Sequence, residues 1–242
     1  MDLPFDRTRR RRIYLMRHAE AAYITAEGAR APDSRVVSIT ERGRAEARDM
    51  ARLMQDVAFD RAIVSGLRRT LETAEIFLAE RKLPIELVSD LEEIRGGDPV
   101  ARAKLSPPDY AYAMFRAGEP GECYAAGESF VAFADRVVPA FHKICAETNW
   151  TKLLMVCHGG VNRAILTDIT CGGLKAFGAF EQDSCCLNVI DIDTCLDTGA
   201  VVRQVLRGVN ITASDPIKSA RGLLSMEGLA KRFVDAGVFA KG

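Results

Sequence analysis

The 242-residue chain has the length and composition of one α/β domain with a modest appendage. Its 33 Lys and Arg side chains balance its 33 Asp and Glu side chains. Because no net charge attracts polyanions, we expect neither nucleic acid nor an anionic membrane as a partner, and any affinity for anions must be built locally. No stretch reaches the roughly 20 apolar residues that span a bilayer, and no secretory signal is recognisable, so a cytoplasmic protein is expected.

Cysteine and histidine are few enough to interpret one by one. The seven cysteines, an odd number without a C-x-x-C pair, predict reduced thiols in the core. No spacing typical of metal ligands is present, and we expect neither a metal nor a cofactor. The three histidines are His18, His142 and His158. Of these, His142 lies in a helical pattern beside Phe141 and is expected to be structural.

Short apolar runs alternate with longer periodic segments along the first two thirds of the chain. Residues 1–12 are interpreted as a basic arm, in which Arg9 to Arg12 are either solvated or draw anions toward a site. A strand over 13–17 is followed by a helix over 40–58 with Thr40 as its N-cap. The next expected elements are a strand over 62–65, a helix over 67–82 and a short strand over 85–88.

A segment over 95–126 is rich in Pro and Gly and is typical of a lid or binding loop. Beyond it we expect a helix over 129–148, a strand over 152–157 and a helix over 161–171. Two further runs, 186–192 and 201–207, are expected to form an antiparallel pair across Thr198 and Gly199. This alternation predicts an α/β fold over residues 13–207, a three-layer αβα sandwich with a mostly parallel central sheet.

Residues 208–242 are interpreted as a C-terminal extension. Apolar residues recur in it at helical spacing, at Leu223, Leu224, Leu229, Phe233 and Val234. The pattern is compatible with a helix packed on the domain and with a contact between two copies in a homodimer.

Charged and nucleophilic side chains follow four of the predicted strands, at the sheet edge where ligands of parallel α/β proteins bind. They are Arg17 and His18, the segment 65–69, the pair Glu92 and Glu93, and the segment 158–160. We expect them to form one cationic pocket with two imidazoles and a carboxyl group. Such a pocket suits phosphoryl transfer: arginine forks neutralise phosphate oxygens, a neutral imidazole attacks phosphorus, and a carboxylic acid protonates the departing oxygen.

These motifs resemble those of the histidine phosphatase superfamily, in the branch that includes phosphoglycerate mutase. The family's Arg-His-Gly-Glu is similar to Arg17-His18-Ala19-Glu20, and its Leu-Thr-x-x-Gly to the segment 39–43. Its Ser-x-Leu-x-Arg-Ala-x-x-Thr-Ala is similar to 65–74, its Leu-x-Glu to 91–93, its Gly-Glu-Ser to 127–129 and its Val-Ser-His-Gly-Gly-Val to 156–161. The resemblance covers about residues 13–192 and implies a histidine-phosphatase-like fold.

The resemblance also implies an activity and a set of roles. It implies a metal-independent phosphoric monoester hydrolase for a small phosphorylated substrate, in which His18 carries the phosphoryl group and Glu93 is general acid and base. The residues expected to hold the phosphate are Arg17, Arg69, His158, Gly159 and Asn162. In this alignment Arg68 is left as a solvated helix residue.

Two departures from the family pattern matter. Ala19 replaces a glycine, which the loop accepts if its backbone angles allow a β-carbon. Ile24 stands where the mutases and several phosphatases place an asparagine against the phosphate. We therefore expect one phosphate ligand to come from elsewhere, either a backbone amide or Asn162.

Two other functions remain as alternatives. A phosphoglycerate-type mutase is disfavoured because residues 94–126 replace the long Arg- and Tyr-rich insertion typical of mutases. An inactive binding protein is disfavoured because the complete set of five expected catalytic residues is present. Glu93 also argues against the short phosphohistidine phosphatases, which lack it. In the lid-like segment, Arg102, Lys104 and Arg116 are either ligands for a second anionic group of the substrate or ordinary surface charges.

Overall fold

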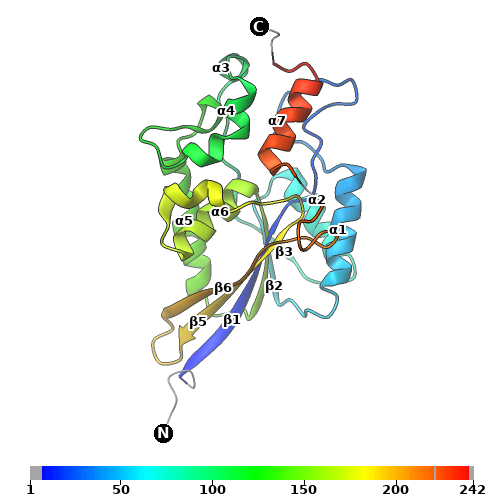
Figure 1. Ribbon diagram of the computed structural model, residues 1–242. Helices are drawn as coiled ribbons and strands as arrows, with labels where there is room; N and C mark the ends of the chain where they lie inside the picture. The colour runs from blue at the N-terminus through cyan, green and yellow to red at the C-terminus, as the bar shows by residue number, and fades with distance from the viewer. Residues whose placement is uncertain (1–6, 221, 240–242) are drawn as a thin grey trace.

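The computed structural model describes residues 7–220 and 222–239. A six-stranded sheet runs through the molecule in the order β3-β2-β4-β1-β5-β6 (Figure 1). Its strands are β1 (Thr8–Arg17), β2 (Arg61–Val64), β3 (Ile85–Leu87), β4 (Lys152–Cys157), β5 (Leu187–Cys195) and β6 (Val201–Ile211). The first four are parallel, and β5 is antiparallel to both β1 and β6. The predicted α/β fold with a mostly parallel sheet is confirmed.

Helices cover both faces of this sheet (Figure 1). Helices α1 (Glu41–Leu53) and α2 (Arg68–Phe77) pack on one face, and α5 (Phe130–Ala146) and α6 (Gly159–Ile169) pack on the other. Because side chains alternate along a strand, Tyr14 and Met16 of β1 face the first helix pair, whereas Ile13 and Leu15 face the second. Burial on both faces explains why the central strands read as continuous apolar runs.

The predicted helices begin close to where they were expected and end earlier. Thr40 caps α1, its hydroxyl accepting a 3.0 Å hydrogen bond from the amide of Gly43. Ser129 caps α5 in the same way. The helix expected to reach residue 58 ends at Leu53, because the chain turns there to enter β2, and α2 ends at Phe77 rather than at residue 82.

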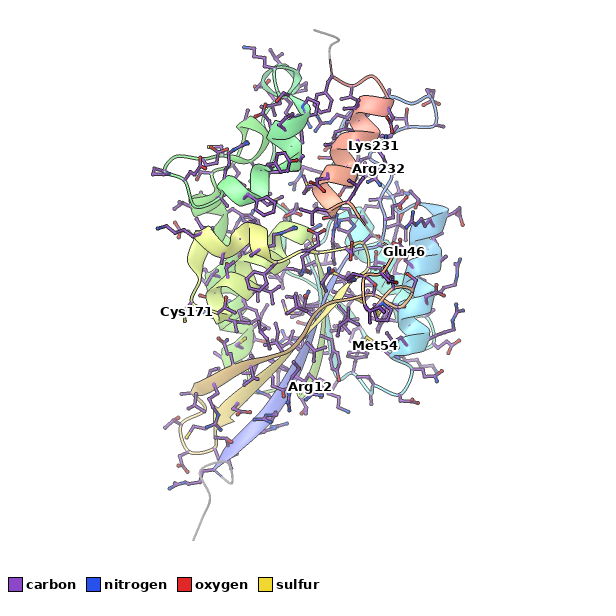
Figure 2. All side chains as sticks on the ribbon, in the orientation of Figure 1. Arg12, Glu46, Met54, Cys171, Lys231 and Arg232 are labelled. Carbon is purple, nitrogen blue, oxygen red and sulfur yellow. The ribbon has the colours of Figure 1, made fainter. Side chains whose placement is uncertain are left out.

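The basic run Arg9 to Arg12 lies in strand β1, so the prediction of a solvated arm over 1–12 is wrong from Thr8 onward; residues 1–6 lie outside the described residues. Figure 2 labels Arg12 on the sheet. Arg10 and Arg12 pair with Asp193 and Asp191 of β5 at 2.7 and 2.6 Å. The hydrogen bonds from Arg10 lower the pKa of Asp193 to about 2. The partners are about 180 residues downstream, which is why the sequence alone did not reveal them.

The segment 95–126 is not an irregular loop, which corrects that part of the interpretation, whereas its role as a lid stays a prediction. It contains α3 (Pro99–Ala103), α4 (Pro107–Ala111) and the short 3-10 helices η2 (Ala113–Arg116) and η3 (Tyr124–Ala126). Two more such turns, η1 (Ser89–Leu91) and η4 (Gly173–Ala179), lie elsewhere in the chain.

Part of the C-terminal extension forms helix α7 (Ser225–Asp235), and β6 continues past residue 207 to Ile211. Helix α7 packs against α4, with Tyr110 and Ala111 of α4 in contact with Ala230 and Phe233. Figure 1 shows both helices beyond the carboxyl end of β1. The extension therefore includes a packed helix over the sheet edge where a ligand is expected; the homodimer stays a prediction.

All seven cysteines are free thiols. Four of them are buried (Cys145, Cys157, Cys185 and Cys186), whereas Cys171 is exposed (Figure 2), so the prediction that all seven belong to the core is wrong. Within the described ranges, no helix is long and apolar enough to cross a membrane.

Candidate active site

Five of the predicted site residues meet beyond the carboxyl ends of the strands. Arg17 ends β1 and His18 follows it; His158 follows β4, Arg69 lies in the first turn of α2, and Glu93 follows η1. His18, Arg69 and His158 are almost completely buried, at 2%, 3% and 0% exposure. The strand ends thus bring together residues that are up to 141 positions apart (158 minus 17).

His18 is held in one orientation by the carbonyl oxygen of Ala19, 2.7 Å from Nδ1. Because a carbonyl oxygen can only accept, Nδ1 carries the proton and Nε2 keeps its lone pair. Burial, together with the positive charges of Arg69 and Arg17, holds the pKa of His18 well below its ordinary value near 6.5. The imidazole is therefore neutral at pH 7, the form that can act as a nucleophile.

His158 lies beside His18, with ring centres 5.3 Å apart. Its Nε2 is 2.7 Å from the hydroxyl of Ser65, and its Nδ1 is buried with no hydrogen-bond partner among the described residues. Burial and the charge of Arg69 lower its pKa well below 6.5 as well. Since the site holds two neutral imidazoles, its positive charge comes from arginines.

Arg17 and Arg69 each keep a donor free. Arg17 donates from Nη1 to the carbonyl of Gln182 at 2.6 Å, and Arg69 from Nη1 to the carbonyl of Ser34 at 2.9 Å. The Nε–H of each is buried, with no partner in the described part of the chain. Leaving a buried charged donor unpaired costs about 1–3 kcal/mol or more. A bound anion would therefore be stabilised by hydrogen bonds that the free protein lacks.

Arg68 differs from its neighbour. Its side chain is 62% exposed and pairs with Glu72 at 2.8 Å, one helical turn away. Arg69, not Arg68, faces the site, as the alignment predicted.

The carboxyl group of Glu93 lies at the N-terminal end of helix α6. Its Oε2 accepts a 3.1 Å hydrogen bond from the amide of Gly160, and its Oε1 accepts one from the amide of Ile94. A β-carbon at Gly160 would lie 2.3 Å from Oε1, so glycine is required for this close approach. The neighbouring Glu92 points elsewhere and pairs with Arg35 at 2.6 Å, as expected for successive side chains of an extended segment.

A pocket of about 80 Å³ lies next to these groups, but neither His18 nor His158 lines it. Its lining includes Arg17, Arg69, Glu93, Gly159 and Gly160. His18 lines an adjoining pocket of about 140 Å³, which shares Arg17, Tyr23, Ser225 and Leu229 with the first. Helix α7 therefore covers both.

Asn162, an expected phosphate ligand, does not reach either pocket. It is fully buried on α6, and its amide nitrogen donates to Oε1 of Gln182 at 2.9 Å. Gln182 also provides the carbonyl that holds Arg17. The geometry thus corrects the prediction: Asn162 belongs to a polar network that includes Gln182, because its position on α6 directs its side chain toward Gln182.

The two departures from the family pattern have simple structural consequences. Ala19 is not among the described residues with positive φ, so its β-carbon is accepted without strain. Ile24 packs in the apolar cluster between α4 and α7 and offers no polar ligand.

Sequence reasoning missed several residues at the pocket. They are Tyr23, Arg30, Tyr110, Arg163 and the four α7 residues Ser225, Met226, Leu229 and Phe233. The Tyr23 hydroxyl is 3.5 Å from Nε2 of His18, and the Arg69 guanidinium carbon is 5.8 Å from the Tyr23 ring centre. Arg163 lies on α6 five residues after His158, and this short distance from a predicted site residue was the one sequence feature that could have indicated it. The lid residues Arg102, Lys104 and Arg116 do not line the pocket; Arg116 pairs with Glu122.

A neutral histidine beside two arginines with free donors and a carboxyl group defines a site suited to phosphoryl transfer through an imidazole. The model of the histidine phosphatase superfamily (branch 1) matches residues 13–203, so the chain belongs to this superfamily. The resemblance inferred from the motifs is confirmed.

Individual relatives are phosphatases by name. The adenosylcobalamin/alpha-ribazole phosphatase of Escherichia coli is 27% identical over 212 residues, which cover 82% of this chain and 98% of that protein. A crystal structure of an alpha-ribazole-5'-P phosphatase from the same species has a TM-score of 0.66 at 25% identity, covering 83% of this chain and 96% of the other. A mycobacterial glucosyl-3-phosphoglycerate phosphatase shares the fold, with a TM-score of 0.66 at 21% identity over 84% and 99% of the two chains.

Proposed function

We propose that the chain hydrolyses phosphate monoesters of small molecules through a phosphohistidine on His18. The observation that carries the proposal is the hydrogen bond from Nδ1 of His18 to the carbonyl of Ala19, which leaves the lone pair of a neutral imidazole on Nε2, in a site where Arg17 and Arg69 each keep a buried Nε–H without a partner among the described residues. Family membership and the phosphatase names of the relatives support the same reaction.

In the first step, Nε2 of His18 attacks phosphorus and forms a P–N bond while the P–O bond to the leaving group breaks. Glu93 gives its proton to the departing oxygen. In the second step, Glu93 takes a proton from water, the water oxygen attacks phosphorus and the P–N bond breaks. Inorganic phosphate is released, and both residues return to their starting states.

Charge is balanced within the pocket during both steps. Arg17 and Arg69 direct buried Nε–H groups toward the phosphate, and His158 has an unpartnered Nδ1 in the part of the chain that the structure describes. The two arginine donors, together with His158 in the tautomer that carries its proton on Nδ1, stabilise charge that develops in the transition state, and removing one such donor typically costs about 10²–10³ in kcat.

Hydrolysis is favoured over mutase activity by the elements that cover the pocket, helix α7 and the segment containing α4, which we call its roof. Helix α7 and the short segment containing α4 leave about 80 Å³ next to Glu93. A mutase must rebind its phosphorylated product in a second orientation and keep water away from the phosphohistidine. No insertion of the mutase type is present between Glu93 and α5.

Arg69 and Arg68 provide a matched test. Arg69→Ala should lower kcat for p-nitrophenyl phosphate by about 10²–10³-fold, because it removes a donor to the phosphate. Arg68→Ala removes the same charge one residue away, where the side chain pairs with Glu72 in solvent, and should leave kcat near the wild-type value. A wild-type protein that releases no phosphate from this ester would contradict the proposal.

A further inference from the structure

Arg30 occupies an unusual position in the roof of the pocket. Its guanidinium carbon lies 4.9 Å from the ring centre of Phe233 and 5.2 Å from that of Tyr110. Its Nη1 donates a 2.6 Å hydrogen bond to the Tyr110 hydroxyl. Over the described ranges, no carboxylate forms an ion pair with it. Aromatic faces stabilise a guanidinium without neutralising it, so Arg30 presents a fixed positive charge to the pocket.

The pocket has more positive charge than a phosphate group alone can neutralise, and the excess charge is that of Arg30. Four arginines line it: Arg17, Arg30, Arg69 and Arg163. Arg163 is neutralised by Glu181 at 3.1 Å. Arg17 and Arg69 together match the two negative charges of a phosphate monoester. Glu93 also lines the pocket, but as the proposed general acid it is protonated and neutral when the substrate binds, so the positive charge of Arg30 remains for another part of the ligand.

We propose that Arg30 binds a carboxylate on the leaving group, so that the substrate is a small phosphorylated carboxylic acid. This inference rests on the phosphatase function proposed above. A carboxylate is favoured over a second phosphate because one guanidinium matches one negative charge, and one of its nitrogens is already engaged by Tyr110. The two adjoining pockets, of about 80 and 140 Å³, are each below the range of roughly 300–1,000 Å³ for drug-sized ligands, which favours a small substrate.

Phe233, one of the two aromatic residues that contact the Arg30 guanidinium, belongs to the C-terminal extension. Phe233 lies on α7, outside the residues 13–203 that match the family model. Leu229 and Met226 of the same helix line the pocket beside it. The common domain thus provides the phosphate site, and the extension together with α4 provides the position that selects the leaving group.

Matched substrates test the proposal. O-phosphoserine and O-phosphoethanolamine differ by one carboxylate, and 3-phosphoglycerate and glycerol 3-phosphate differ by a carboxylate in place of a hydroxymethyl group. The quantity measured is the ratio of kcat/KM within each pair. We expect the wild-type protein to prefer the carboxylate in both pairs. Arg30→Met should lower this ratio by about 10- to 100-fold, as expected for loss of a hydrogen bond to a charged group.

Two variants control for charge and folding. Lys104→Met removes an exposed positive charge from the segment 95–126, away from the pocket, and should leave the ratio unchanged. Arg30→Lys keeps the charge and should restore part of the preference. A ratio that Arg30→Met does not change, or a wild-type ratio near one, would overturn the role of Arg30 while the phosphatase function stands. Absence of phosphate release from every ester, p-nitrophenyl phosphate included, would instead overturn the proposed function itself.

Discussion

At the scale of single residues, His18 depends on neighbours that act in different ways. The carbonyl of Ala19 fixes the proton on Nδ1, whereas burial and the arginines disfavour a second proton. His158 is kept neutral by the same causes. The two neutral imidazoles therefore lower the free energy of unfolding at acid pH, because the unfolded chain accepts protons that the folded chain does not.

This linkage gives a prediction with a definite sign. Below about pH 6.5 the unfolded imidazoles are protonated while the folded ones stay neutral, so the free energy of unfolding should fall as the pH is lowered. The contribution is full above pH 6.5 and is lost at up to about 1.4 kcal/mol per pH unit for each imidazole. Urea unfolding at pH 7 and pH 5.5 in phosphate-free buffer measures it. His158→Gln should reduce the difference between the two pH values, and His142→Gln, a change at a half-exposed side chain, should retain it.

Glu93 is proposed to donate a proton, and this role depends on the leaving group. An alkoxide needs the proton, whereas p-nitrophenolate leaves without it. Glu93→Gln keeps the shape of the side chain and should slow glycerol 3-phosphate far more than p-nitrophenyl phosphate, by up to the roughly 10²–10⁴-fold of general acid catalysis. Glu92→Gln should affect neither substrate, since Glu92 pairs with Arg35 outside the pocket. Equal losses on both substrates for Glu93→Gln would assign it a purely orienting role.

The site residues that were predicted from the sequence lie at or after the ends of strands, whereas most of those that were missed lie far from these motifs. Arg17 ends a strand, and His18, Arg69, Glu93 and His158 come after strands; the rule that strand ends converge was enough to group them. Tyr23 and Arg30 lie in a long connection without regular structure, whose path depends on what it packs against. Asn162 was misplaced because the direction of a helical side chain depends on the orientation of the whole helix.

At the scale of elements, the contact between α4 and α7 determines the shape of the substrate site. Phe233 is 2% exposed and contacts Tyr110, with ring centres 5.7 Å apart. The helical spacing in the extension was compatible with a packed helix such as α7 and with a dimer contact, and it did not indicate which element the helix packs against. The partner, α4, lies in the segment whose prolines suggested a loop, because Pro107 stands at the start of a helix, where it is favourable.

Removing the aromatic ring from this contact should have both a structural and a kinetic effect. Phe233→Ala leaves a cavity between α4 and α7, and such changes cost about 3–5 kcal/mol when the ring is fully buried. We expect calorimetry to show a lower melting temperature for the variant protein. Steady-state kinetics should show a higher KM for small substrates. Val234→Ala is the matched control on the same helix, since Val234 is 49% exposed. If the two variants have the same KM, α7 does not shape the site.

At the scale of the whole molecule, a chain with no net charge concentrates positive charge in one pocket. The arginines supply there the neutralisation that divalent cations supply in other phosphoryl-transfer enzymes. We therefore predict that treatment with a chelator leaves phosphatase activity intact. Loss of activity that a divalent cation restores would contradict this expectation.

The phosphohistidine itself is the most direct test of the account. Rapid quenching after mixing with a ³²P-labelled ester should trap label on the protein in a form that is stable to alkali and lost in acid, and mass spectrometry should place it on His18. His18→Ala should abolish the label and turnover together, while His142→Ala, which changes a histidine outside the site, should retain both. Label on a different residue, or undiminished turnover by His18→Ala, would contradict the central claim.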